Sequence, residues 1–386
     1  MKLSSKNKAI LIELVVALII GFFILQGNII EPTINISNTL QNDSTPINNN
    51  QSFIEPKEND SVITIMAVGD IMLSRDVNTK IQKYNDYNYP FLKTADLLKS
   101  ADITFGNLES PITPGRKINT NEMVFRADPE SVEGLKLAGF DLVTLTNNHT
   151  LNFGKEGLSD TFKYLNTAGI EYMGAGETVK DAYLPVIKEI NGMIFAFLAY
   201  SYATEPLSAY DSEKPNPTLA AMDFDKMKQD VARASESADF VIVSMHDGYE
   251  YQFTPNQHQK DFAHAAIESG ADLVVGHHPH VVQTMEQYQD GYILYSLGNF
   301  VFDQMWSQET REGIIAEITF SKKGISAFEF FPVVIEDYAQ PRFADAEEAG
   351  VIIERLDFNY QAIGVDPVRE NSLTGLTISK EHANLP

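Results

Sequence analysis

The chain has 386 residues, of which 44% are hydrophobic and 21% are charged, so it can bury a sizeable core and is not disordered throughout. Its 29 Lys and Arg residues against 53 Asp and Glu residues give a formal net charge of −24. A body this acidic repels phosphate backbones, which argues against nucleic acid as a partner. The absence of cysteine excludes disulfides, thiolate metal sites, thiol catalysis and anchoring through a lipobox cysteine.

The N-terminus has the pattern of a membrane anchor. Three lysines within the first eight residues precede an apolar run over residues 9–25, and no small-residue cleavage signal follows it. The length of this run suits a single transmembrane helix, and the positive-inside rule places the lysines in the cytoplasm. We therefore expect residues 1–30 to form a cytoplasmic N-terminus and anchor. The protein would be a single-pass protein of the cell membrane with an extracellular C-terminal domain. A cleaved signal peptide is the alternative.

Residues 31–60 are rich in Asn, Ser, Thr and Pro and are predicted to form a disordered linker. Beyond them, residues 61–366 are predicted to form one domain, followed by a polar tail at 367–386. Buried apolar runs in this domain predict strands at 62–70, 103–109, 141–149, 240–248 and 272–278. Amphipathic stretches between them predict helices at 91–100, 129–138, 155–168, 222–237 and 257–269.

Two β-hairpins are also expected, one at 186–200 turning on Asn191-Gly192 and one at 316–331 with a longer loop. The alternation of strands and helices predicts an α/β layered fold with helices on both faces. Because hairpins add antiparallel strands, the sheet should be mixed, and we expect two sheets packed together.

Polar residues gather where the five expected strands end. They are Asp70; Asn107 and Glu109; Asn147, Asn148 and His149; His246; and His277, His278 and His280. In open α/β sheets the carboxyl ends of strands converge on one crevice, so these side chains should meet. Carboxylates, amide oxygens and imidazoles together suit one or two divalent ions such as Mn, Fe or Zn. The sequence therefore predicts a metal site at this edge.

Each cluster also has a purely structural interpretation. Asp70 could belong to a simple turn, the two asparagines before His149 could form an Asx-turn, and His246 could be a hydrogen-bonded core histidine. The loop from His278 to His280 is harder to explain in this way, and five clusters at five strand ends favour the metal site. The sequence contains no serine-hydrolase elbow, P-loop, zincin motif or dinucleotide fingerprint.

With these motifs in view, the chain resembles the CapA family of poly-γ-glutamate capsule synthesis proteins, a branch of the calcineurin-like metallophosphoesterase superfamily. The resemblance covers about residues 62–335. It implies a layered metallophosphoesterase-like sandwich of mixed sheets flanked by helices, preceded by one transmembrane helix. The matching segments are residues 67–75, 105–113, 144–158, 244–251, 270–283 and 295–304.

The resemblance also implies a role for each matching residue. His149 would be the catalytic residue that protonates the leaving oxygen. The implied metal ligands are Asp70, Glu109, Asn148, His246, His278 and His280. Residues that could contact these ligands or the substrate are Arg75, Asn107, Asn152, Asp247 and His277.

The chain departs from the family pattern at three positions. Met72 stands where phosphoesterases usually carry a histidine ligand, so the second metal position is weakened. Asn152 stands where relatives often have an aspartate that would orient a histidine, and Asp247 stands where they often have a tryptophan. These departures concern catalytic strength and metal preference and leave the predicted fold unchanged.

The implied function is a membrane-anchored extracellular component of poly-γ-glutamate capsule synthesis or export, with a metal-dependent hydrolase site. Its substrate would be an anionic polymer or a phosphoester, and its partners would be other membrane subunits of the synthesis complex. Because the body is acidic, free polyglutamate would be repelled unless a metal intervenes. Two alternatives stay open: a secreted metal-dependent phosphoesterase, and a non-catalytic scaffold subunit with a relict site.

Overall fold

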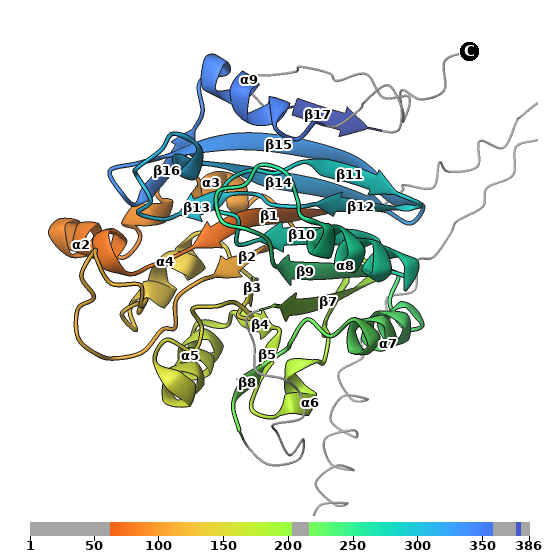
Figure 1. The fold of residues 1–386 in the computed structure, drawn as a ribbon, viewed down its shortest axis with the longest axis horizontal. Helices are drawn as coiled ribbons and strands as arrows, with labels where there is room; N and C mark the ends of the chain where they lie inside the picture. Colours follow the sequence, from red (N-terminus) through yellow and green to blue (C-terminus); the bar gives the residue numbers. More distant parts are fainter. Residues whose placement is uncertain (1–61, 203–215, 358–375, 380–386) are drawn as a thin grey trace, which may run out of the picture. The chain divides into compact units, whose positions relative to one another are not determined.

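Two β-sheets packed face to face form the centre of the structure, a computed structural model that describes residues 62–202, 216–357 and 376–379 (Figure 1). The strands of the larger sheet are β1 (Ile63–Ile71), β2 (Ile103–Leu108), β3 (Leu142–Thr144), β4 (Glu171–Met173), β13 (Asn299–Val301), β14 (Glu312–Ser321), β15 (Gly324–Glu336), β16 (Gln340–Phe343) and β17 (Leu376–Ser379). The strands of the smaller sheet are β6 (Val186–Ile190), β7 (Met193–Ser201), β9 (Phe240–His246), β10 (Leu273–His277), β11 (Met285–Tyr288) and β12 (Gly291–Leu294).

Both sheets are mixed. The larger runs in the order β16-β15-β14-β1-β2-β3-β4, with β13 beside β1 and β17 beside β15. The smaller runs in the order β11-β12-β10-β9-β7-β6, and a two-stranded ribbon pairs β5 (Ala175–Gly176) with β8 (Thr218–Leu219). The pairs β1–β2, β2–β3, β7–β9 and β9–β10 are parallel. This arrangement agrees with the predicted pair of mixed sheets.

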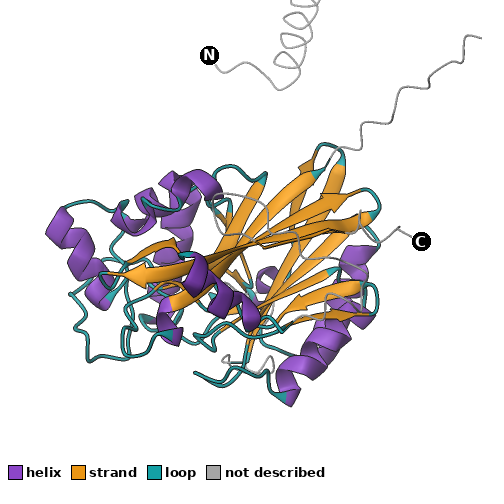
Figure 2. Cartoon of the chain, turned by 90° about the horizontal axis from the view of Figure 1, so that it is seen from above, coloured by secondary structure: helices purple, strands orange, loops and turns teal. Residues whose placement is uncertain are grey.

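Helices cover the outer faces of the sheets, and Figure 2 shows most of them gathered at two sides of the strands. The α-helices are α2 (Arg75–Tyr84), α3 (Ala95–Leu98), α4 (Ser131–Leu137), α5 (Gly154–Ala168), α6 (Val179–Ala182), α7 (Phe224–Ser235), α8 (Gln257–Glu268) and α9 (Ala346–Glu354). Two 3₁₀ turns, Tyr89–Phe91 and Glu309–Arg311, complete the described part.

The apolar pattern of β1 shows why the protein forms layers. Ile63 and Ile65 join an apolar cluster that draws from both sheets. Met66 and Val68 point the other way, into a cluster shared with α2, α4 and α5. Successive side chains of a strand alternate between faces, so a strand with apolar side chains on both faces must be covered on both sides. Together with a third cluster under α7 and α8, this gives a helix–sheet–sheet–helix order.

The five predicted buried strands are confirmed, although β3 is only three residues long. The predicted helix at 91–100 is shorter in the structure, where only Ala95–Leu98 is α-helical. The first hairpin turns at Asn191-Gly192, with φ of 51° and 74°, as a tight two-residue turn requires. The second hairpin differs from the prediction, because Ser321 pairs with Gly324 and the loop has only two residues.

The predicted anchor at residues 9–25 and the predicted linker at 31–60 lie outside the described residues. Of the helices that the structure describes, none has the length and apolar character needed to cross a bilayer. The C-terminal segment predicted as a polar tail contributes β17, which pairs antiparallel with β15.

Four parallel strands are preceded directly by an aspartate that makes the same two hydrogen bonds to the neighbouring strand. Asp272, for example, donates its backbone N–H to the Val241 carbonyl at 2.9 Å, and its Oδ2 accepts the Val241 N–H at 2.7 Å. A parallel pair lacks a tight turn that would set its register, so this double contact fixes the pairing where the strand starts. The same double contact joins Asp102 to Thr64, Asp141 to Thr104 and Asp239 to Ile194.

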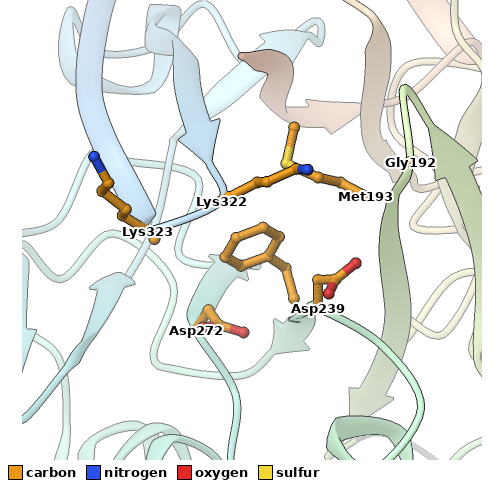
Figure 3. Close-up of a pocket in the computed structure, with 8 residues that line it drawn as sticks. Gly192, Met193, Asp239, Asp272, Lys322 and Lys323 are labelled. Carbon is orange, nitrogen blue, oxygen red and sulfur yellow. The ribbon is translucent and has the colours of Figure 1, made fainter. Parts of the chain in front are cut away.

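Asp239 and Asp272 also line a hollow of about 530 Å³ at the amino ends of β9 and β10 (Figure 3). The two hairpin turns, at Gly192 and at Lys322-Lys323, close the other sides of this hollow. Both carboxylates already accept a backbone hydrogen bond there. The hollow therefore belongs to the framework that holds the strand starts.

Burial raises the pKa of the Asp272 carboxyl to about 6. A carboxyl whose folded pKa lies above its unfolded value of about 3.9 destabilises the fold once ionised, so stability is lost as pH rises from about 4 to 6. Asp272→Asn keeps an oxygen for the Val241 N–H and cannot ionise. Its free energy of unfolding relative to wild type should rise over that interval, by at most about 3 kcal/mol.

Urea unfolding at pH 4, 5, 6 and 7 measures this difference. Asp272→Ala is the control, because it also removes the acceptor of a backbone N–H and should cost about 1–3 kcal/mol in addition. A difference between wild type and Asp272→Asn that is the same at every pH would contradict the assigned cause.

Candidate metal centre

Strand ends from both sheets meet at one place. Strand pairing sets Asp70 of β1 level with Asn107 of β2 and with Asn299 of β13. In the other sheet it sets His246 of β9 level with His277 of β10. All five residues are buried. The structure therefore brings together the polar strand ends that the sequence pattern singled out, at the carboxyl ends of parallel strands.

Asp70 has no solvent exposure and is surrounded by donors. Asn107 Nδ2 donates to its Oδ1 at 2.8 Å, and the His278 N–H donates to its Oδ2 at 3.3 Å. The Nδ1 atoms of His280 and His277 lie 3.2 Å and 3.6 Å from its oxygens. Burial alone would raise the pKa of Asp70, but the close approach of His277 and His280 and their charge hold it well below its usual value.

Glu109 is equally buried but poorly satisfied. Its Oε1 has no hydrogen-bond partner among the described residues. It faces His149 Nε2 at 3.8 Å and His280 Nε2 at 3.9 Å. Burial and the nearby charge of Asp70 raise the pKa of Glu109 well above its usual value. A buried carboxylate oxygen with imidazoles around it is the arrangement that a bound cation would satisfy.

His246 Nε2 lies 3.1 Å from Asn148 Oδ1. The ring centroid of His278 is 4.8 Å from that of His246. Tyr202 Oη lies 3.0 Å from His278 Nε2, and His278 Nδ1 is without a partner in the described part of the chain. Burial lowers the pKa of His246, and burial with the charge of His280 lowers that of His278 to about 3. Both imidazoles are therefore neutral at pH 7, as metal ligation requires.

The loop after β10 is strained. His278 has φ of 99° and His280 has φ of 57°, conformations that residues other than glycine rarely adopt. Such residues cost on the order of 1–3 kcal/mol each and persist only where the surroundings enforce them. The Tyr251 N–H donates to the Pro279 carbonyl at 2.8 Å and holds the loop from outside. This backbone conformation places both imidazoles near the buried carboxylates. A strained conformation kept at such a place indicates a functional loop.

Ligand atoms collect in three overlapping groups, and within each group one atom per residue lies within 4.8 Å of the others. The groups are Glu109, His246 and His278; Asp70, Glu109 and His280; and Glu250, His278 and His280. The partnerless Oε1 of Glu109 and Nδ1 of His278 belong to these residues. The residues present therefore fit divalent ions, and mixed carboxylate and imidazole ligands suit Mn, Fe or Zn.

His149 is oriented by two neighbours. Asn152 Oδ1 accepts the Phe125 N–H at 2.7 Å and lies 3.0 Å from His149 Nδ1. Because that oxygen is fixed as an acceptor, Nδ1 carries the proton, and the neutral ring turns the lone pair of Nε2 toward Glu109. Burial lowers the pKa of His149 to about 4, and the Phe125 ring stacks on it at 3.8 Å.

Three residues considered from the sequence lie beside the cluster with other partners. Arg75 forms a two-pronged ion pair with buried Asp303, including Nε to Oδ2 at 3.0 Å, so its guanidinium is engaged within the protein. Asp247 Oδ2 lies 2.6 Å from Nδ1 of His258. Met72 is buried in an apolar cluster.

Sequence reasoning gave no role to Asn299, which the structure places directly behind the cluster. Its Oδ1 lies 3.0 Å from His280 Nδ1, and its Nδ2 donates to the Thr310 carbonyl at 2.8 Å and to Gln304 Oε1 at 3.1 Å. The amide is thereby fixed with its oxygen toward the imidazole. Such a contact sets the tautomer of a ligating histidine and leaves Nε2 for the ion. The only signal in the sequence was its place in the family segment 295–304.

Comparison with known proteins gives the family. Residues 64–304 match the family described as "Bacterial capsule synthesis protein PGA_cap". The chain belongs to this family. It is 34% identical to the capsule biosynthesis protein CapA of Bacillus anthracis, over 74% of this chain and 70% of that protein. It is 32% identical to the PGA biosynthesis protein CapA of Bacillus subtilis strain 168, over 72% of this chain and 73% of that protein.

Two solved structures are similar to this chain at lower sequence identity. A hypothetical protein from Thermus thermophilus aligns with a TM-score of 0.46 at 15% identity, over 70% of this chain and 98% of that one. A calcineurin-like phosphoesterase from Bacillus subtilis, YfkN, aligns with a TM-score of 0.36 at 12% identity, over 73% of this chain and 90% of that one.

Asn299→Ala should weaken metal binding, because it removes one of the two oxygens that lie against His280 Nδ1, the other being Oδ2 of Asp70. Loss of such a supporting contact typically costs about 10–100-fold in metal affinity. Titration of the metal-stripped protein with Mn²⁺ by calorimetry measures the change. Asn166→Ala on α5 is the matched control, and unfolding in EDTA separates a stability defect from a binding defect. Wild-type affinity in a folded Asn299→Ala protein would show that Asn299 does not position a ligand.

Proposed function

We propose that this protein is a metal-dependent hydrolase that acts on an anionic polymer in the synthesis or export of a poly-γ-glutamate capsule. The observation that carries the proposal is the buried Glu109 carboxylate, whose Oε1 lacks a described partner and faces two imidazoles. Membership of the capsule synthesis family supports the biological setting.

Asp70, Glu109, Asn148, His246, His278 and His280 would hold the ions. Divalent ions held there would supply Lewis-acid activation of a water and of the substrate oxygen. Asn107 supports the arrangement, because its Nδ2 donates to Asp70 and lies 3.3 Å from His246 Nδ1. Asn147 Nδ2 in turn donates to Asn107 Oδ1 at 3.0 Å. These two linked amides hold the Asp70 carboxylate and the His246 imidazole in place before substrate binds.

His149 handles the proton. Its Nε2 carries the lone pair and faces Glu109 within the centre, so it can accept a proton from the attacking water. In hydrolysis the water oxygen forms the new bond, the bond to the leaving nitrogen or oxygen breaks, and His149 passes the proton to that leaving atom. Asn152 keeps the ring in the required tautomer during the transfer.

Aromatic side chains at the border of the centre favour a polymeric substrate over a free phosphate. The Tyr251 ring lies 6.2 Å from the His280 ring, and Trp306 packs edge-on against Tyr251 at 5.9 Å. Tyr249 and Trp306 are 68% and 62% exposed. Exposed aromatic faces can pack on the planar amides of an extended chain, whereas the net charge of −24 gives anionic substrates no general attraction.

Two separate histidine-to-alanine variants test whether the site is a metal-dependent hydrolase. His149→Ala should retain metal and lower activity by about 10²–10⁴-fold, because a proton carrier is lost and no ligand is removed. His278→Ala should lose both metal and activity. Metal content of the purified protein and capsule output of cells carrying each variant are the two measurements.

His264→Ala is the control, since His264 stacks on Tyr288 away from the centre. Unchanged capsule output in both site variants, with normal protein levels, would exclude the hydrolase and favour a scaffold. Turnover of simple phosphodiesters without any effect on capsule would favour a secreted phosphoesterase.

The proposal places the hydrolase domain outside the cell, held by residues 9–25 beside other membrane subunits of the synthesis complex. Three lysines before this apolar run and the missing cleavage signal support this orientation. Protease added to intact cells should therefore degrade the domain and leave a short protected fragment. A fully protected domain, or a mature N-terminus after Leu25, would contradict the anchored topology.

A further inference from the structure

The third group of ligand atoms contains Glu250, a carboxylate that the sequence analysis did not select. One of its oxygens lies within 4.8 Å of ligand nitrogens on His278 and His280. Glu250 is only partly exposed and sits in the connection between β9 and α8, outside the strands that carry the other groups. Its carboxylate therefore approaches the two imidazoles from the partly exposed connecting segment.

Several contacts hold this connection against the strained histidine loop. The Tyr251 N–H donates to the Pro279 carbonyl at 2.8 Å, and Tyr251 itself has φ of 65°. Gln283 Nε2 donates to the Gln252 carbonyl at 2.8 Å. The backbone around Tyr251 is thus tied to Pro279 and Gln283, on either side of His280 in the chain. The backbone position of Glu250 beside the histidine loop is therefore set by the fold.

The negative charge of Glu250 acts on groups of the centre, among them His280 and Glu109. Burial, together with the charge of Glu250 and a hydrogen bond to it, raises the pKa of the Tyr251 hydroxyl. The carboxylate is therefore electrostatically coupled to the buried groups.

The inner group of Asp70, Glu109 and His280 offers two carboxylates and one imidazole. The family histidine that would add to it is replaced by Met72, whose sulfur accepts the Ser74 N–H at 3.1 Å within an apolar cluster. The centre thus lacks the histidine ligand expected at position 72, and it has the Glu250 carboxylate as an additional oxygen donor.

We propose that Glu250 is a further metal ligand of the centre, its carboxylate joining the imidazoles of His278 and His280 on a divalent ion. The inference rests on the metal site proposed above. The partnerless Nδ1 of buried His278 supports it, because that atom has no other described partner to satisfy it. Since Glu250 adds an oxygen donor to a set that lacks the histidine at position 72, the centre should favour Mn²⁺ or Fe²⁺ over Zn²⁺ relative to a histidine-richer set.

The test is a metal titration of the full chain after removal of metal with EDTA. Glu250→Gln should bind Mn²⁺ at least about tenfold more weakly than wild type, since loss of even a supporting contact costs that much. Glu250→His should bind metal again but with its preference shifted toward Zn²⁺, because imidazole replaces oxygen. Calorimetry and the electron paramagnetic resonance spectrum of bound Mn²⁺ report binding without any activity assay.

Asp247→Asn is the matched control, because it removes the same charge from the same connection and its carboxylate contacts His258 instead. Its Mn²⁺ affinity should stay close to that of wild type. An equal loss in Asp247→Asn and Glu250→Gln would reduce the effect to general charge and overturn the inference. Wild-type affinity in Glu250→Gln would overturn it as well, while the metal site itself would stand. If wild type binds no divalent ion, the proposed function fails together with this inference.

Discussion

Two carboxylates without solvent exposure, Asp70 and Glu109, impose the constraint around which the centre is arranged. Burial of an ionised carboxylate costs several kcal/mol unless charge and hydrogen bonds compensate it. Asp70 receives this compensation from Asn107 and the histidines, whereas Glu109 Oε1 does not. The opposite directions of their pKa shifts express this difference. A divalent ion held by these residues would stabilise both ionised forms.

The two ends of the parallel strands have separate tasks. At the amino ends, aspartates such as Asp239 and Asp272 fix the register of a strand against its neighbour. At the carboxyl ends, the same strands carry His246 and His277. A slip of one residue would turn every side chain of a strand to the other face, so the placement of these two histidines depends on contacts made at the far end of the sheet. Stability of the framework and geometry of the centre are therefore linked through strand register.

Outside the strands, the centre depends on loops held in costly conformations. His278 and His280 occupy left-handed backbone regions, and the neighbouring connection with Tyr251 does the same. His149 is fixed differently, by the Asn152 oxygen on one side and the Phe125 ring on the other. Asn152 shows that a neutral amide can orient the imidazole as a carboxylate would, provided that a backbone N–H fixes its oxygen.

The sequence by itself determined the layered fold and the polar strand ends. Alternation along a strand and the order of strands and helices follow from local periodicity, which needs no knowledge of distant partners. Only the tertiary structure decided that Arg75 pairs with Asp303, 228 residues away, and that Asn299 lies behind His280. It also decided that Glu250 reaches the imidazoles from a connecting segment. Such contacts depend on how strands of two sheets and their loops are packed together, and no local pattern in the chain encodes that packing.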